Sequence, residues 1–257
     1  ASDVYKRQDL NPDHLNFETI SKLQNADLSN LPELSSNERI GSCITSPRKF
    51  IAIGLNYSDH AAEVGADIPK EPIVFMKATS CIVGPNDDVE IVSGSKKLDW
   101  EVELGIIIGK EAKHISENQS QDHILGYCLV NDVSEREWQL EKMGQWVKGK
   151  SHDTYGPVGP HLVTKDEISD VNNLKMSLDV NGKRMQTGNT STMIFNVDVI
   201  VSYLSKYMTL LPGDIITTGT PPGVGMGMKP QQFLKAGDMM KLSVENLGEQ
   251  NSKVVAL

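Results

Sequence analysis

The sequence predicts a mostly β fold of the α+β class, in which the chain folds back on itself as a sandwich or roll. From Lys49 onward, many short apolar runs are separated by turn residues, a pattern typical of strands. Only two segments carry the spacing and the capping residues of a longer helix, and no strand–helix–strand rhythm alternates along the chain. Strands that dominate without such an alternation favour one sheet packed on another.

The predicted strands begin with "KFIAIGLNY" and recur to the C-terminal part of the chain. In "LDVNGKRM", the Asn181-Gly182 pair stands between two alternating runs, which predicts a type I′ hairpin because both residue types tolerate a positive φ. The other runs are "PIVFM", "DDVEIV", "LDWEVELGIII", "HILGYCLVND", "GDIITTG" and "DMMKLSVENLG".

Two segments are predicted as helices. "VSEREWQLEKMG" carries Ser134 and Glu137 at the spacing of a capping box, and the helix is expected to stop at Gly144. "NVDVIVSYLSKYM" has Asn196 as its expected N-cap. The apolar residues of this second segment share one helical face: Ile200, Val201, Leu204 and Met208.

The N-terminal part of the chain differs in composition from the rest. Residues 9–45 are polar and rich in Asn and Ser, with short helical patches such as "FETISKLQNA". We expect residues 1–45 to form a small N-terminal region and residues 46–257 to form the main domain. The opening "ASDVYKRQ" does not match the following residues in character, and we interpret it as a non-native start on a truncated natural N-terminus.

Composition and charge argue against several classes of protein. The net charge of −9 and the lack of a block of basic residues argue against a nucleic-acid-binding surface. No apolar run reaches the roughly 20 residues that a membrane-spanning helix needs. The opening residues have no apolar core and are therefore not expected to be a secretory signal. The three cysteines form no CxxC pair, so we expect a reducing, cytoplasmic setting without a disulfide framework or a zinc site.

Three acidic residues on predicted strands form a candidate metal site. Side chains alternate across a strand, so Glu101 and Glu103 share one face at a spacing of roughly 6.6 Å. Asp132 ends the next long strand, where functional groups commonly lie. Three carboxylates suit Mg²⁺ or Mn²⁺ rather than zinc or copper. On this pattern alone, the alternative is a solvated strand face whose acids point at water.

A second candidate site lies in "GLNYSDHAAEVG". His60 and Glu63 are three residues apart and would share one face of a helical turn. A glutamate that orients an imidazole makes a general base able to deprotonate water. Gly54 and Gly65 flank the segment and would let it open and close as a lid. The alternative is a surface His–Glu pair on a short exposed helix.

Two further segments carry residues that could contact a ligand. In "WVKGKSHD", Lys148 and Lys150 would point the same way in an extended chain, either as a solvated face or with a lysine buried beside acids. Such a buried lysine could hold a substrate carboxylate or a developing enolate charge. The glycine-rich "TTGTPPGVGMGMKP" lacks the GK[ST] ending of a phosphate-binding loop. We expect either a tight loop whose amides and Thr220 hydroxyl approach a ligand carboxylate, or a plain surface loop.

One absent motif and one glutamine add little to the prediction of function. No GxSxG motif is present, which argues against a serine nucleophile on an elbow turn. Gln139 lies on the helix predicted to begin at Ser134, but its position there is uninformative.

Six segments, in this order, give the chain a resemblance to the fumarylacetoacetate hydrolase family that covers roughly residues 46–257. They are "GLNYSDHAAE", "FMKATSCIVGPND", "DWEVELGIIIG", "GYCLVNDVSERE", "KGKSHDTYGPVGP" and "LLPGDIITTGTPPGVG". The resemblance implies a β-rich roll that binds Mg²⁺ or Mn²⁺ through Glu101, Glu103 and Asp132. It also matches His60 and Glu63 to the water-activating dyad of the family, on a segment that closes over ligand.

The resemblance also implies contacts and partners. Lys150, Gln139 and Thr220 match positions that contact substrate in relatives, and Lys150 would steady an anionic intermediate. Arg136 matches a commonly basic position in the same site. The family implies a small keto acid as the substrate and a homodimer as the assembly.

Two shorter stretches bear on the substrate. "MGQW" and "GMGMKP" are similar to a subgroup of the family that hydrolyses 2,4-diketo-3-deoxy-L-fuconate, and relatives often carry the label ureidoglycolate lyase. We therefore expect a metal-dependent hydrolase that cleaves a C–C bond of a 2,4-diketo acid to give pyruvate and a second acid. The alternatives are a lyase or an oxaloacetate decarboxylase on the same metal site, or a metal-stabilised binding module without catalysis.

Overall fold

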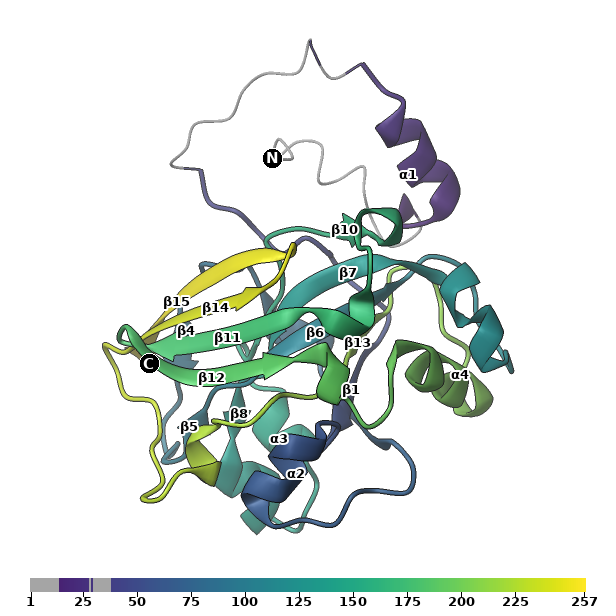
Figure 1. The fold of residues 1–257 in the computed structure, drawn as a ribbon. Coiled ribbons are helices and arrows are strands. Elements are labelled where there is room, and N and C mark those ends of the chain that lie inside the picture. The colour runs from purple at the N-terminus through teal and green to yellow at the C-terminus, as the bar shows by residue number, and fades with distance from the viewer. Residues whose placement is uncertain (1–13, 28, 30–37) are drawn as a thin grey trace.

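Two large β-sheets pack against each other in the computed structural model, which describes residues 14–27, 29 and 38–257. One sheet has the strand order β10 (Val163–Thr164), β7 (Ile124–Asn131), β6 (Val102–Ile108), β13 (Ile215–Thr217), β1 (Phe50–Gly54) and β2 (Ile73–Lys77). The other has the order β12 (Lys183–Asn189), β11 (Lys175–Val180), β14 (Met239–Val244), β15 (Gly248–Ala256) and β4 (Val89–Ile91). Strands β11 and β14 contact β6, so one sheet covers the other (Figure 1). The predicted mostly β roll is confirmed.

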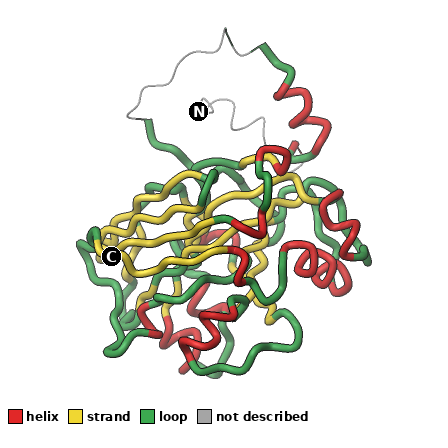
Figure 2. Tube along the Cα trace, in the orientation of Figure 1, coloured by secondary structure: helices red, strands yellow, loops and turns green. Residues whose placement is uncertain are grey.

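Shorter elements complete the described part of the chain. Two small ladders pair β3 (Ile82–Val83) with β9 (Gly156–Pro157), and β5 (Leu98–Asp99) with β8 (Ser134–Glu135). The α-helices are α1 (Phe17–Gln24), α2 (Ser58–Val64), α3 (Val147–Lys150) and α4 (Val197–Tyr207). A π-helical turn is η5 (Glu137–Glu141), and the 3₁₀ turns are η3 (Thr79–Cys81), η4 (Glu117–Asp122), η6 (Lys165–Glu167), η7 (Val171–Asn173), η8 (Thr190–Thr192) and η9 (Gly225–Gly227). Most of these helical segments lie around the margins of the sheets (Figure 2).

Strands β6 and β7 form the centre of the core. Every residue of both strands is buried, and the two strands pair in antiparallel fashion. β6 lies between β7 and β13 within its own sheet, and β11 and β14 pack on it from the other sheet. A strand covered in this way reads as a nearly continuous apolar run, which explains the sequence of β6 apart from its glutamate.

The hairpin and the helix N-cap were predicted correctly. Asn181 and Gly182 join β11 to β12 with φ values of 52° and 75°, the positive values that a type I′ turn requires. The Asn196 side chain accepts a hydrogen bond from the Val199 N–H at the start of α4. Such a cap satisfies one of the backbone N–H groups that have no partner inside the helix.

The helix predicted to begin at Ser134 is wrong in its start and its type. Ser134 and Glu135 form β8, which pairs with β5, and a π-helical turn follows over Glu137–Glu141. The Ser134 hydroxyl donates to the Asp132 carbonyl at 2.8 Å and so does not cap a helix. Because β8 pairs with β5, which is distant in the sequence, this tertiary contact overrides the local capping signal at Ser134.

The N-terminal region is described only in part. The helix α1 confirms the predicted helical patch, and Leu15 just before it is buried in the main core. The predicted non-native start at residues 1–8 lies outside the described residues, and the division at residue 45 stays a prediction. None of the helices in the described ranges is both long enough and apolar enough to cross a membrane.

Candidate metal centre and active-site pocket

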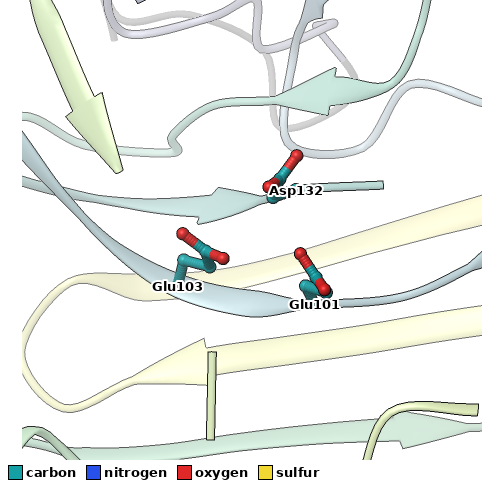
Figure 3. Close-up of side chains that lie close together, drawn as sticks. All are labelled: Glu101, Glu103 and Asp132. Carbon is teal, nitrogen blue, oxygen red and sulfur yellow. The ribbon is translucent and has the colours of Figure 1, made fainter. Parts of the chain in front are cut away.

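Three acidic side chains converge where β6 begins and β7 ends. The register pairs Val102 with Asn131, and the Asp132 N–H donates to the Glu101 carbonyl at 3.0 Å. Glu101, Glu103 and Asp132 each offer an oxygen, and these oxygens lie within 4.8 Å of one another (Figure 3). All three residues are buried. The predicted convergence is confirmed, and the alternative of a solvated strand face is wrong.

Basic side chains compensate two of the three carboxylates. Lys150 Nζ lies 2.6 Å from Glu101 Oε2 and 2.6 Å from Asp132 Oδ2. Lys77 donates to Asp132 Oδ1 at 2.5 Å, and Arg136 Nη2 lies 2.7 Å from Glu101 Oε1. Burial raises the pKa of Glu101, but the attraction of Arg136 and Lys150 outweighs burial and holds this pKa at about 2.

Glu103 receives no such compensation. Within the ranges that the structure describes, no lysine or arginine forms an ion pair with it. Its Oε2 accepts hydrogen bonds from the Thr217 hydroxyl and, at 2.8 Å, from the Gly219 N–H. Burial, together with the charges of Asp132 and Glu101, raises the pKa of Glu103 well above its usual range. A cation next to Glu103 would therefore stabilise its ionised form.

The donor set fits a hard divalent cation. The ion-paired cluster around the triad holds more acidic than basic side chains: Asp99, Glu101, Glu103 and Asp132 against Lys77, Arg136 and Lys150. The acids offer only oxygen donors, which suit Mg²⁺ or Mn²⁺ better than zinc or copper. The residues present therefore fit such an ion, and the triad is a candidate metal site.

Lys150 reaches the acids from a helix. It lies at the end of α3, so the segment is not extended and the condition under which Lys148 and Lys150 would point the same way is not met. The alternative of a lysine buried beside acids is confirmed for Lys150. Lys150 is buried, whereas Lys148 is exposed and donates to a backbone carbonyl of the preceding turn. Burial lowers the pKa of Lys150, but the charges of Asp132 and Glu101 raise it by more. The ammonium is therefore a lasting positive charge and not a base.

His60 and Glu63 form the predicted pair on α2. His60 Nδ1 lies 2.9 Å from Glu63 Oε2. A carboxylate only accepts hydrogen bonds, so Glu63 places the ring proton on Nδ1 and leaves Nε2 as a proton acceptor. The other oxygen of Glu63 accepts from the Gly223 N–H at 2.9 Å, which fastens α2 to the glycine-rich loop. His60 is only 7% exposed, so the alternative of a surface pair is wrong for the imidazole.

The triad and the imidazole face one cavity of about 300 Å³. Its ionisable end comprises His60, Glu101, Glu103, Asp132, Arg136 and Lys150. Most of its other lining side chains are apolar. Cavities for small molecules start at roughly this volume, so the cavity suits a small ligand with a charged end.

The three residues predicted to contact substrate also line this cavity, and each has protein partners. Arg136 donates from Nε to Asp99 Oδ2 at 2.8 Å and from Nη1 to Gln139 Oε1 at 3.0 Å. Thr220 Oγ1 donates to a β6 carbonyl at 2.9 Å and accepts from Gln186 Nε2 at 2.8 Å. Their role in binding substrate stays a prediction.

Two buried charged residues of this site were not singled out from the sequence. Asp99 accepts from the N–H groups of Gly225 and Met226 at 2.7 and 3.0 Å, and so holds the glycine-rich loop. Lys77, at the end of β2, pairs with Asp132. The alternation of acids before β6 extends back to Asp99 and could have indicated it, whereas a lysine that ends an apolar strand carries no such signal.

Comparison with known proteins agrees with this reading of the fold and the site. Residues 49–255 match the family described as fumarylacetoacetate (FAA) hydrolase C-terminal. A Burkholderia lata protein provisionally named a hydrolase is 56% identical over 243 residues, which make up 94% of this chain and 86% of that protein.

Two solved structures are similar over most of the chain. Fumarylacetoacetate hydrolase from the psychrophilic Exiguobacterium antarcticum has a TM-score of 0.84 at 38% identity, covering 91% of this chain and 84% of that one. The 2-hydroxyhepta-2,4-diene-1,7-dioate isomerase from Mycobacterium marinum has a TM-score of 0.74 at 38% identity, covering 85% and 78%.

The fold and the site thus define a β-rich enzyme class with a buried acidic centre suited to a divalent metal. The chain belongs to the fumarylacetoacetate hydrolase family.

Removing the charge of Glu103 tests the metal site. We expect Glu103→Gln to weaken the binding of Mn²⁺ or Mg²⁺ by at least about tenfold, because the amide keeps the shape of the side chain but loses a charged ligand. Isothermal titration calorimetry on metal-free protein measures this affinity. Glu141→Gln, which removes an exposed acid paired with Lys97, is the matched control and should leave the affinity unchanged. Equal affinities in the two variants would show that the triad does not hold the ion.

Gly227 tests how Glu63 is held. A Cβ at Gly227 would lie 2.9 Å from Glu63 Oε2, and the backbone there has no positive φ that would exclude alanine. Gly227→Ala should therefore displace the carboxylate and remove the downfield Nδ1 proton signal of His60 from the proton NMR spectrum. Glu63→Ala, which deletes the acceptor, provides the reference spectrum. If the signal persists in Gly227→Ala, the loop does not control the position of Glu63.

Proposed function

We propose that the protein is a divalent-metal-dependent hydrolase that cleaves a C–C bond of a 2,4-diketo acid to give pyruvate and a second acid. The proposal is carried by one observation: a buried acidic triad and a glutamate-held histidine line the same small cavity. Hydrolysis of a diketo acid needs both parts, a positive centre for the carboxylate and keto oxygens and a base for the attacking water.

The residues have separable tasks in this reaction. Glu101, Glu103 and Asp132 would hold Mg²⁺ or Mn²⁺, which when bound supplies Lewis-acid polarisation of the keto acid. His60 takes a proton from water at Nε2 and directs the hydroxyl to the C4 carbonyl, while Glu63 stabilises the imidazolium.

Breaking the C3–C4 bond leaves negative charge on the pyruvate half, next to the ammonium of Lys150. The hydroxyl stays on C4 as part of the new acid, and the proton that His60 took returns to C3. Helix α2 contributes His60 and Val64 to the cavity wall and would limit the entry of other water molecules. Arg136, Gln139 and Thr220 would contact the substrate from the remaining sides.

An isomerase acting in the same cavity is the second candidate, favoured by the likeness to 2-hydroxyhepta-2,4-diene-1,7-dioate isomerase. His60 would then move a proton within the substrate without adding water. A lyase or a decarboxylase would likewise need no attacking water. Turnover of diketo acids, ureidoglycolate and oxaloacetate in ¹⁸O-labelled water separates these reactions, because only hydrolysis puts the label into the second acid.

His60→Ala tests the base directly. We expect kcat on a diketo acid to fall by about a hundredfold or more, because the attacking water loses its proton acceptor. Mg²⁺ affinity, measured by calorimetry, should change little because the acids are untouched. His161→Ala, at an exposed histidine, is the control for general effects of the substitution. Full activity in His60→Ala would remove this residue from the proposed mechanism.

We also propose that the protein forms a homodimer through β2. In the described residues β2 is an edge strand of the six-stranded sheet, and its Val74 and Met76 side chains are 36% and 37% exposed. An edge strand with exposed apolar side chains is a template for pairing with a second strand. A two-fold axis lets the same strand of a second copy supply that partner.

Charges on this edge should separate the subunits. In sedimentation velocity we expect the double variant Val74→Lys/Met76→Lys to sediment as a monomer, because paired edges would bring like charges together. Met239→Lys changes an apolar side chain of the other sheet that is 44% exposed, and should leave a dimer intact. A monomeric wild type, or a double variant that remains dimeric, would contradict this interface.

A further inference from the structure

We propose that the cavity selects 2,4-diketo acids whose tail, beyond the bond that is cleaved, is apolar. An alkyl or aryl acylpyruvate would then be preferred over an acid with a hydroxylated tail. This inference rests on the proposed function, because it concerns the substrate atoms on the far side of the carbonyl that water attacks.

Helix α2 sets the direction of that tail. His60, which would direct the water, marks the position of the attacked carbonyl. Val64 follows four residues later on the same helical face, and both side chains line the cavity. Val64 is 36% exposed, so its apolar surface is not fully covered by the described part of the protein. The first atoms beyond the carbonyl would therefore meet an apolar side chain.

Two aromatic rings form another part of the wall. The rings of Phe75 and Trp146 meet edge to face, with 5.2 Å between centroids and 62° between planes. Trp146 lies so close over Gly54 that a Cβ there would be 2.4 Å from its indole, which holds the ring against the end of β1. Lys150 Nζ is 5.1 Å from the centroid of the Phe75 ring. Phe75 thus contacts both Trp146 and the ammonium of Lys150.

Leu140 and Met226 add apolar side chains to the cavity wall from two further elements. Leu140 lies on η5 and is 43% exposed, although it lines the cavity. Met226 lies on η9, in the loop whose N–H groups Asp99 holds. A methionine side chain adapts its shape to different apolar groups. Apolar side chains from several separate elements therefore surround the expected path of the tail.

Two polar side-chain oxygens beside this wall already have protein partners. Thr220 donates to the Val102 carbonyl and accepts from Gln186. The Gln139 carbonyl oxygen accepts from Arg136. A hydroxyl on the tail would lose its hydrogen bonds to water and find few replacements. A buried methylene, in contrast, improves binding by about fourfold.

A series of acylpyruvates tests the inference in turnover. With Mg²⁺ present, we expect kcat/KM to rise from acetylpyruvate through butanoylpyruvate to hexanoylpyruvate, by about fourfold per methylene until the cavity is full. The rise should appear in KM rather than in kcat. A dihydroxylated analogue of butanoylpyruvate should be about a hundredfold poorer than butanoylpyruvate itself.

Variants of the wall connect this preference to named residues. Leu140→Ser and Trp146→Ala should flatten the dependence on tail length, because KM should rise more for the longer tails than for acetylpyruvate. Met143→Ser is the matched control, because Met143 lies in the same segment, is 91% exposed and does not line the cavity. It should keep the wild-type dependence.

Calorimetry with straight-chain 2-oxo acids of increasing length makes the test independent of turnover. If affinity rises with length, Leu140→Ser removes the rise and no diketo acid is cleaved, the apolar tail site stands as a binding site and the proposed hydrolase function falls. If diketo acids are cleaved but the hydroxylated analogue is preferred, the inference is overturned and the hydrolase function stands. The inference is also overturned if Leu140→Ser and Met143→Ser behave alike, or if affinity does not depend on length.

Discussion

The burial of several carboxylates in one small region, where β6 meets β7, is the constraint on which the rest of the site depends. An uncompensated buried charge costs several kcal/mol, so the surrounding elements must bring positive groups to it. Three segments do so. Lys77 lies at the end of β2, Arg136 lies directly before η5, and Lys150 lies at the end of α3. These contacts compensate Asp132 and Glu101 but not Glu103, whose ionised form has no basic partner among the described residues. A divalent cation would supply that missing positive charge, which is the physical basis for expecting a metal ion there.

The acidic cluster and the His60–Glu63 pair are joined by one loop, residues 219–228. Asp99 in the cluster accepts the N–H groups of Gly225 and Met226, while Gly223 of the same loop donates to Glu63. The loop therefore fixes the distance between the charged end of the cavity and the helix that carries His60. Backbone groups can make these contacts only where side chains leave room, and this explains why the loop is rich in glycine.

The shared face of Glu101 and Glu103 could be predicted from the sequence because it depends on local periodicity, whereas the metal site itself was favoured only by the family resemblance. Glu101 and Glu103 share a face in any strand. The position of Lys150 could not be predicted in the same way. The short helix that carries it forms together with its contacts to acids that are distant in the sequence. The capping signal at Ser134 failed for a similar reason: the Glu135 carboxylate accepts backbone N–H groups of residues 96 and 97, which holds this segment in a ladder. The predicted substrate contacts of Arg136, Gln139 and Thr220 rested mainly on the family resemblance.

Lys150 links metal binding to substrate binding in the proposed reaction. Its ammonium lies 2.6 Å from both Glu101 and Asp132, two of the side chains that would hold the ion. If these carboxylates bound a cation, Lys150 would lose part of its compensation and would become available to an anion in the cavity. A keto acid supplies that anion. The same lysine that stabilises the acids before the ion binds can therefore balance the negative charge of the substrate afterwards, without any new buried group.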